Sequence, residues 1–249
     1  MQPVIFNDLG LIDYKSAWDY QEKMLQQNLA IKSARRTRPD EDHPETLHYF
    51  LLCEHPPVYT LGKSGDISNV LMSDDELLKN NIEFFHTNRG GDITFHGLQQ
   101  IVGYPIIDLE KFYTDIGKYL RNLEETIILA IAEYGIEGGR SAGETGVWID
   151  AGVKGKERKI CAIGVRCSRW ITMHGFALNV NTDLSYFNNI IPCGITGKQV
   201  TSIEKELGRK VDYEAVKENI KDKFSRVFDV QYSVGPPTAA DRPPMLSAE

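Results

Sequence analysis

A cysteine and a lysine are the residues of this sequence whose surroundings point most clearly to chemistry. Cys193 stands between Pro192 and Gly194, a pair that makes the backbone turn and leaves a thiol accessible. Lys159 opens an apolar run that is typical of a strand. A lysine charge beside a thiol lowers the thiol pKa, so more of the nucleophilic thiolate is present near neutral pH. The two residues together predict covalent catalysis by cysteine, as an acyl transferase requires.

Structural interpretations of the same residue types compete with this one. A lone cysteine is more often a small buried hydrophobic residue than a nucleophile. Cys161 is the rival thiol, but its apolar, strand-like surroundings favour an inert core position. A lysine at the start of a strand needs no catalytic role, and His96 and His174 both fit ordinary structural histidines. The turn around Cys193 favours this cysteine, because a turn is a poor place to bury a thiol.

The second informative stretch is rich in glycine and covers residues 88–97. Its Gly90-Gly91 pair lets backbone amides approach a ligand closely, although the pair alone is a weak signal for phosphate binding. Polar groups come from Arg89, Thr94 and His96 in the same stretch. Small residues near Lys159 and after His174 leave room for an acyl chain; they are Ala162, Gly164, Gly175 and Ala177.

The composition is that of a globular chain without a broadly basic surface. Its 249 residues are 41% hydrophobic and 25% charged, which suits one sizeable globular domain or two small ones. The formal net charge of −7 argues against general nucleic-acid binding. No apolar run approaches the roughly 18 residues that cross a bilayer, and the N-terminus resembles neither a signal nor a transit peptide. We therefore expect a cytoplasmic protein that interacts with neither nucleic acid nor membrane.

The sequence predicts neither disulfides, nor a metal site, nor a cofactor. The four cysteines show no CxxC spacing, so we expect reduced thiols. His43, His48 and His55 are scattered in or beside loops, whereas zinc needs three or four suitably spaced ligands. The sequence contains neither a GxGxxG stretch nor a Walker-A motif, and thioester exchange needs no redox or nucleotide cofactor.

Apolar periodicity and turn residues predict helices and strands that alternate irregularly. We expect helices over residues 14–31, 74–80, 114–134, 201–207 and 212–227. We expect strands over residues 4–9, 47–54, 82–86, 101–109, 146–149, 158–166 and 174–181. The two strands at 146–149 and 158–166 should form a hairpin, and residues 33–45 should be a mobile surface loop. This pattern favours an α+β fold, a mixed sheet with packed helices, over a doubly wound sheet.

The domain organisation follows from the same pattern. Residues 1–233 are predicted to form one catalytic domain. Residues 234–249 are rich in proline and are predicted to be a disordered tail.

Several motifs follow one another in a recognisable order. The most specific is Arg-Gly-Gly-Asp-Ile-Thr-Phe-His-Gly at residues 89–97, followed by Gln100 and Tyr104-Pro105. Further matching stretches lie at residues 8–14, 54–62, 145–148, 159–164, 174–177 and 192–194. In this order they resemble the octanoyltransferases, also called lipoyl(octanoyl) transferases, over residues 8 to about 230. The chain departs from the family at Leu98-Gln99, where Pro-Gly is usual, and at Cys161, which replaces Ala or Gly.

The resemblance implies a fold, a reaction and partners. The implied fold is the α+β catalytic domain shared with biotin and lipoate ligases. The implied reaction moves an octanoyl group from acyl carrier protein onto a lysine of lipoyl domains, in E2 subunits of 2-oxoacid dehydrogenases and in the glycine-cleavage H protein. Such partners are typically acidic, so basic residues should face them. The candidates are Arg35, Arg36, Arg38, Lys154, Lys156 and Arg158.

The resemblance also assigns roles to residues. Cys193 would be the acyl-thioester nucleophile, and Lys159 would activate it. The acyl site would be lined by Arg89, Gly90, Gly91, Asp92, Ile93, Thr94, Phe95, His96, Ala162, Ile163, Gly164, Gly175, Phe176 and Ala177. Two alternatives remain at this point: an ATP-dependent lipoate or biotin ligase of the same fold, which needs no cysteine, and a non-catalytic module that binds acylated proteins.

Overall fold

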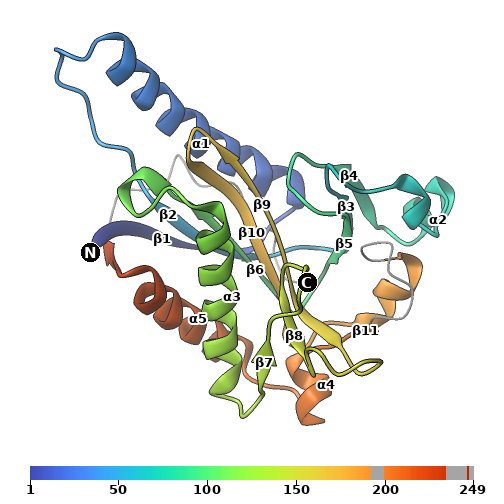
Figure 1. The fold of residues 1–249 in the computed structure, drawn as a ribbon. Helices are drawn as coiled ribbons and strands as arrows, with labels where there is room; N and C mark the ends of the chain where they lie inside the picture. The colour runs from blue at the N-terminus through green and yellow to red at the C-terminus, as the bar shows by residue number, and fades with distance from the viewer. Residues whose placement is uncertain (192–198, 234–245, 247–249) are drawn as a thin grey trace.

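A large mixed sheet runs through the molecule (Figure 1). The computed structural model describes residues 1–191, 199–233 and 246, and nine strands of this part form the sheet. Their order is β12-β1-β2-β6-β10-β9-β8-β7, with β11 beside β9. The strands are β1 (Gln2–Leu11), β2 (Tyr49–Glu54), β6 (Gln100–Ile106), β7 (Gly138–Gly139), β8 (Val147–Ile149), β9 (Arg158–Ser168), β10 (Ile171–Asn179), β11 (Gln199–Val200) and β12 (Val230–Ser233).

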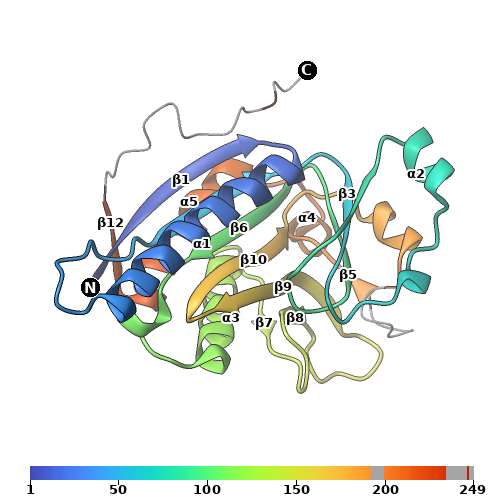
Figure 2. The same ribbon diagram turned by 90° about the horizontal axis from the view of Figure 1, so that it is seen from above.

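Helices cover both faces of this sheet (Figures 1 and 2). Helix α1 (Tyr14–Thr37) packs on one face, and α3 (Ile116–Ala132) and α5 (Tyr213–Phe228) pack on the other. Successive side chains of a strand point to opposite faces of the sheet, which explains why there is an apolar core on each face. In β2, Phe50 lies in the core of α3 and α5, where it stacks on Phe224 with ring centroids 4.1 Å apart, whereas the next residue, Leu51, lies in the core of α1.

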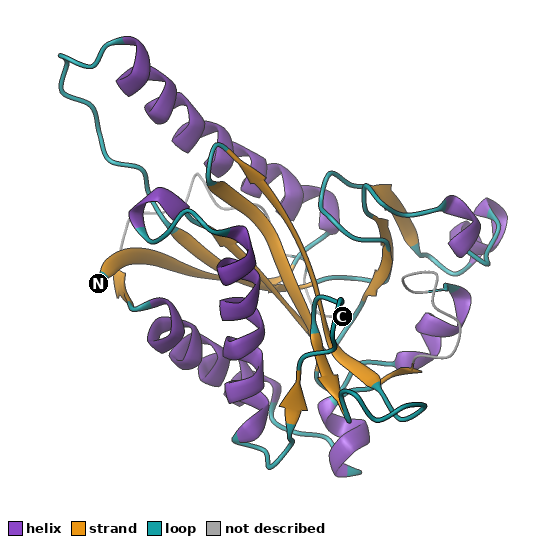
Figure 3. Ribbon diagram, viewed as in Figure 1, coloured by secondary structure: helices purple, strands orange, loops and turns teal. Residues whose placement is uncertain are grey.

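A second, small sheet stands beside the large one (Figure 3). Its strands are β4 (Glu83–His86), β3 (Val58–Leu61) and β5 (Ile93–His96), in that order. It packs with the short helix α2 (Asp74–Lys79) and with the 3-10 turn η3 (Leu184–Asn189) around its own apolar cluster. The 3-10 turn η1 (Ile67–Asn69) precedes α2 in the chain. The remaining elements are the turn η2 (Leu109–Lys111) and the helix α4 (Ile203–Leu207). The architecture is the α+β fold that the sequence predicts.

One part of the predicted loop at residues 33–45 is wrong, because α1 continues to Thr37. The apolar pattern of the helix ends near residue 31, but polar contacts stabilise the turns that follow. Lys32 bonds Asp108 at 2.9 Å, and Arg35 donates to the carbonyl of Pro44 at 2.7 Å and pairs with Glu45. These contacts fasten the last turns of the helix to the chain that returns beneath it.

Most other predicted elements are confirmed within a few residues. Helix α3 begins at Ile116 and ends at Ala132, and the predicted hairpin is β8 and β9. A capping box at Ser73 begins α2, and Ser202 caps α4, which therefore begins at Ile203 and not at residue 201 as predicted. The predicted tail over residues 234–249 lies outside the described residues except for Leu246.

No helix among the described residues is long and apolar enough to cross a membrane. The same part of the chain contains no group of three or more His, Cys, Asp or Glu side chains arranged to hold a metal ion.

Candidate active site

A pocket of about 450 Å³ lies where β9 and β10 meet the glycine-rich stretch before β5. Nearly all of the predicted site residues line it: Arg89, Gly90, Gly91, Asp92, Ile93, Thr94, His96, Lys159, Ala162, Ile163, Gly164, Gly175, Phe176 and Ala177. Phe95 does not; it is buried in the small sheet, where it stacks on Tyr186 with ring centroids 4.5 Å apart. Cys193 lies outside the described residues.

Small side chains on the paired strands β9 and β10 leave room for the pocket. In the β9–β10 register, Gly175 lies opposite Gly164, and Ala177 lies opposite Ala162. A Cβ on Gly164 would stand 2.9 Å from the carbonyl oxygen of Gly90, so only glycine lets the 89–91 stretch approach β9 this closely. That approach is fixed by the amide of Gly90, which donates to the carbonyl of Val165 at 2.9 Å.

Arg89 and Asp92 brace the glycine-rich stretch from its two ends. The buried guanidinium of Arg89 donates to the carbonyl and the hydroxyl of Thr60 on β3, at 2.5 and 2.9 Å. Asp92 accepts from the side-chain amide of Asn69 at 2.9 Å and from the backbone amide of Ile93. Hydrogen bonds with a charged partner are stronger than neutral ones, so these contacts hold the glycine-rich stretch in one conformation.

The contacts of Asn69 continue toward the predicted nucleophile. The carbonyl of Asn69 accepts from the amide of Ile191 at 2.9 Å, and Val70 forms an antiparallel bridge with Ile190. The chain is therefore fastened to Asn69 and Val70, beside the small sheet, up to the second residue before Cys193.

Lys159 enters the pocket from the start of β9. Its ammonium nitrogen lies 4.6 Å from the ring centroid of Trp148, its register partner on β8, and this geometry is a cation–π contact. Cys161, two residues further along β9, is fully buried in the main core. Burial raises the pKa of the Cys161 thiol, which disfavours the thiolate that a nucleophile requires.

The two candidate histidines are buried and neutral. Burial lowers the pKa of His96 to about 3 and that of His174 also to about 3. His96 lies 2.9 Å from the side-chain oxygen of Gln100, and His174 lies 2.8 Å from that of Asn88. Neither ring can supply a positive charge near neutral pH, so Lys159 is the pocket-lining side chain best suited to favour a thiolate.

Some pocket residues escape prediction because distant segments supply them. Tyr14 at the start of α1 and Asn179 at the end of β10 both line the pocket. Asn179 accepts from the side chain of Gln100 and donates to the carbonyl of Thr201 at 2.9 Å. The period-2 alternation of β6, with Gln100, Val102 and Tyr104 on one face, was the available signal for the rest of this wall.

Gln99 replaces the glycine that is usual in the resembling family and still takes a glycine-like conformation. Its φ is +61°, and its carbonyl accepts from the amides of Val180 and Asn181 and from the hydroxyl of Thr182. The amide of Gln99 donates to Glu54 at 2.6 Å. These bonds offset the strain of a positive φ, so the turn keeps its shape without glycine.

Comparisons with known proteins agree on one family. The lipoyl protein ligase A/B catalytic domain matches residues 13–225. An octanoyltransferase of Flavobacterium psychrophilum is 60% identical over 223 residues, which cover 89% of this chain and 95% of the relative. One of Christiangramia forsetii is 56% identical over 225 residues, 90% of this chain and 95% of the relative.

The fold also has solved counterparts. A bipartite lipoate protein ligase from Thermoplasma acidophilum superposes with a TM-score of 0.68 at 14% identity, covering 97% of this chain and 89% of that one. This likeness shows that the two proteins share a fold.

Proposed function

Because the chain belongs to the octanoyltransferases, within the lipoyl protein ligase A/B catalytic-domain family, we propose that Cys193 carries the octanoyl group as a thioester between its donor and its acceptor. Octanoyl transfer in protein lipoylation is the reaction, and lipoyl domains are the general class of acceptor. The proposed donor is octanoyl-acyl carrier protein. The proposed acceptors are lipoyl domains of 2-oxoacid dehydrogenase E2 subunits and the glycine-cleavage H protein.

The observation that carries the proposal is the position of Lys159. It lies in the pocket whose wall is the Gly164–Gly175 and Ala162–Ala177 ladder. The pocket combines the Lys159 ammonium, which can exchange a proton, with room for an acyl chain along its strands, and a cysteine acyl transferase needs both.

The first half-reaction loads the enzyme. The thiolate of Cys193 attacks the thioester carbonyl of the donor, and the tetrahedral intermediate collapses with cleavage of the carbon–sulfur bond to pantetheine. The departing pantetheine sulfur takes a proton from the Lys159 ammonium. This step leaves an octanoyl-Cys193 thioester, a free pantetheine thiol and a neutral Lys159 amine.

The second half-reaction discharges it. The neutral ε-amine of the acceptor lysine attacks the Cys193 thioester, and the Cys193 thiolate leaves as the amide forms. The attacking nitrogen gives its surplus proton to the neutral Lys159 amine. Lys159 thereby regains its charge and Cys193 its thiolate, so the cycle closes without a cofactor.

Mass spectrometry of the intact protein tests the proposal. After incubation with octanoyl carrier protein, the wild type should gain one octanoyl mass that hydroxylamine removes. Cys193→Ala should gain none, and Cys161→Ala should gain the adduct normally. An adduct that maps to Cys161, or transfer that depends on ATP and releases pyrophosphate, would overturn it.

The role of Lys159 is tested by two substitutions that separate charge from proton transfer. Lys159→Met should raise the pH midpoint of Cys193 alkylation by iodoacetamide and slow both half-reactions. Lys159→Arg keeps a charge but cannot lose its proton usefully, so it should alkylate readily and discharge its acyl group poorly. An unchanged alkylation profile in Lys159→Met would exclude Lys159 as the activating group.

A further inference from the structure

A buried carboxylate lies behind the pocket and takes no part in the reaction described above. Glu124 is on α3, its side chain is 0% exposed, and it contacts three groups. One carboxylate oxygen pairs with Arg121 at 2.8 Å and with Arg140 Nε at 3.0 Å. The other accepts from the backbone amide of Gly146 at 3.0 Å. Burying a charge costs free energy unless it is paired and hydrogen-bonded, as this one is.

The amide of Gly146 belongs to the connection that forms part of the pocket wall. This connection, residues 140–146, joins β7 to β8, and its Gly143, Glu144 and Thr145 line the pocket. Arg140 fastens the other end of the connection to α3, because it also donates to Glu125 at 2.5 Å. Glu124 therefore holds both ends of the connection, through Arg140 and through Gly146.

The open side of Gly146 in turn faces the side chain of Lys159. Its φ is +123°, and a Cβ built on it would stand 2.6 Å from the carbonyl oxygen of Cys161 and 3.5 Å from Cε of Lys159. The β8–β9 register shifts at this point, between Val147 and Trp148. The stem of Lys159 thus passes the side of Gly146 where a Cβ would stand, and its ammonium lies over the ring of Trp148.

We propose that Glu124 is a positioning residue for Lys159: it fixes the amide of Gly146 and so holds the surface against which the lysine stem packs. The inference rests on the proposed function, because it gives Glu124 a role only through Lys159. The charged groups of this corner are Arg121, Glu124 and Glu125 on α3, Arg140 and Glu144 on the 140–146 connection, and Lys159 on β9.

Substitutions at Glu124 separate positioning from stability. Glu124→Gln keeps an oxygen for the Gly146 amide but removes the charge, so it should lower thermal stability and leave the pH midpoint of Cys193 alkylation unchanged. Glu124→Met combined with Arg140→Met removes the acceptor and one of its two arginine partners, and the other, Arg121, is 44% exposed and can be solvated by water. Because apolar replacements of a buried ion pair are often tolerated, this double variant should fold.

The double variant should raise the alkylation midpoint by about 0.5 pH unit or more, a loss of about threefold in thiolate at pH 7. The matched control is Glu125→Gln, which loses a contact of the same arginine without touching Gly146, and it should keep the wild-type midpoint. Glu124→Ala provides a second removal of the acceptor, should the double variant fail to fold.

The outcomes distinguish this inference from the proposed function. A wild-type midpoint in the folded double variant or in Glu124→Ala, together with a raised midpoint in Lys159→Met, would refute the positioning role alone. A wild-type midpoint in Lys159→Met would refute the activating role of Lys159 and, with it, the route through Gly146. A midpoint that rises equally in Glu125→Gln would also overturn the inference, because general loosening of α3 would then suffice.

Discussion

Lowering the pH from 7.5 to 5.5 should destabilise the folded chain steeply, because four of its histidines are buried as neutral rings. They are His48, His55, His96 and His174, and none is more than 7% exposed. Burial lowers the pKa to about 4 for His48 and His55 and to about 3 for His96 and His174. The unfolded chain takes up protons at the ordinary histidine pKa of about 6.5, whereas the folded chain does not.

The sign and size follow from this difference in bound protons. Below pH 6.5 the unfolded state binds more protons than the folded state, so the free energy of unfolding falls as the pH falls. Between pH 7.5 and 5.5 each such histidine contributes a loss of about 1.4 kcal/mol, and four contribute about 5 kcal/mol. Carboxyl groups of the unfolded chain have ordinary pKa values of about 3.9–4.3, so the unfolded chain takes up few protons on them above pH 5.5. Since whole domains are stable by about 5–15 kcal/mol, the loss should approach unfolding.

Urea unfolding followed by tryptophan fluorescence at pH 7.5, 6.5 and 5.5 measures this loss. His55→Gln should reduce it by about one quarter, since that ring accounts for one proton of four. His86→Gln is the matched control, because His86 is exposed on β4 and its replacement should leave the pH dependence as it is. A total loss below about 1.5 kcal/mol, the share of a single histidine, would refute the reasoning.

Three further perturbations test the site and its surroundings. Gly175→Ala should reduce the free energy of unfolding by about 3 kcal/mol or more, because the alanine Cβ would stand 2.1 Å from the carbonyl oxygen of Gly103 on β6. A thermal midpoint within about two degrees of the wild-type value would contradict this prediction. Cys161→Ala should lose about 1 kcal/mol through lost packing and keep the rate of acyl transfer, and a transfer rate reduced tenfold would give Cys161 a chemical role. Reversing the charges of Lys154 and Lys156 should lower kcat/KM for the carrier protein and weaken the salt dependence of kcat/KM. If kcat/KM of the wild type is the same at low and at high salt, the idea that charge steers the docking is refuted.

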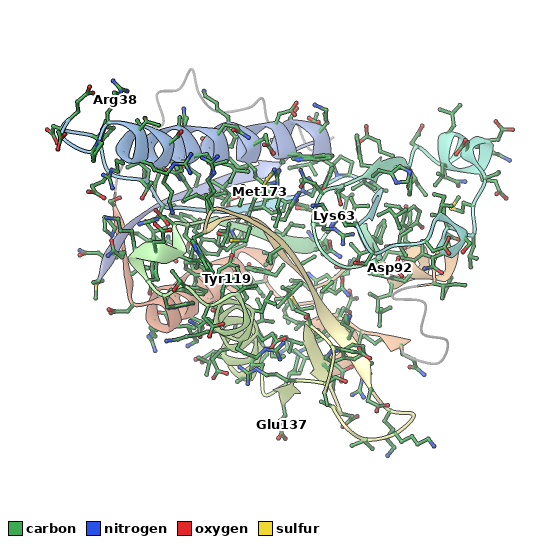
Figure 4. The ribbon with its side chains drawn as sticks, turned by 45° about the horizontal axis from the view of Figure 1, so that its top comes forward. Arg38, Lys63, Asp92, Tyr119, Glu137 and Met173 are labelled. Carbon is green, nitrogen blue, oxygen red and sulfur yellow. The ribbon has the colours of Figure 1, made fainter. Side chains whose placement is uncertain are left out.

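Basic residues of the β8–β9 hairpin fit a docking surface better than those at the end of α1. Arg35 pairs with Glu45 and Arg38 pairs with Glu41, so their charges are compensated. Figure 4 also shows Arg38 at the far tip of α1, well away from the pocket residue Asp92. Lys154 and Lys156 instead lie on the connection that leads directly into Lys159.

The sequence predicts best those elements that local patterns determine. The apolar stripe predicts α3, and the turn-rich stretch before Lys159 predicts the β8–β9 hairpin. The small sheet was not fully predicted, because β3 and β5 are only four residues each and are bounded by proline and glycine. The end of α1 was wrong because Arg35 makes contacts that no helical periodicity contains.

The candidate site also contains residues that local sequence patterns predict and residues that they do not. Motifs place Lys159 and the 89–96 stretch in the pocket, since each is a continuous segment whose composition is unusual. Glu124 could not be recognised, because a glutamate on a helix normally faces solvent. Its role depends on Arg140 and Gly146, which only the folded chain brings beside it.

The antiparallel bridge between Val70 and Ile190 has a mechanical consequence. It joins the segment that leads toward Cys193 to the residues after η1, beside the small sheet, while Lys159 belongs to a strand of the large one. The position of Ile191 relative to Lys159 therefore depends on the joint between the small sheet and the large one. Asp92, through Asn69, lies at the joint. Asp92 also lines the pocket, so the proposed acyl chain and the segment that ends at Ile191 would share one contact, the hydrogen bond between Asn69 and Asp92.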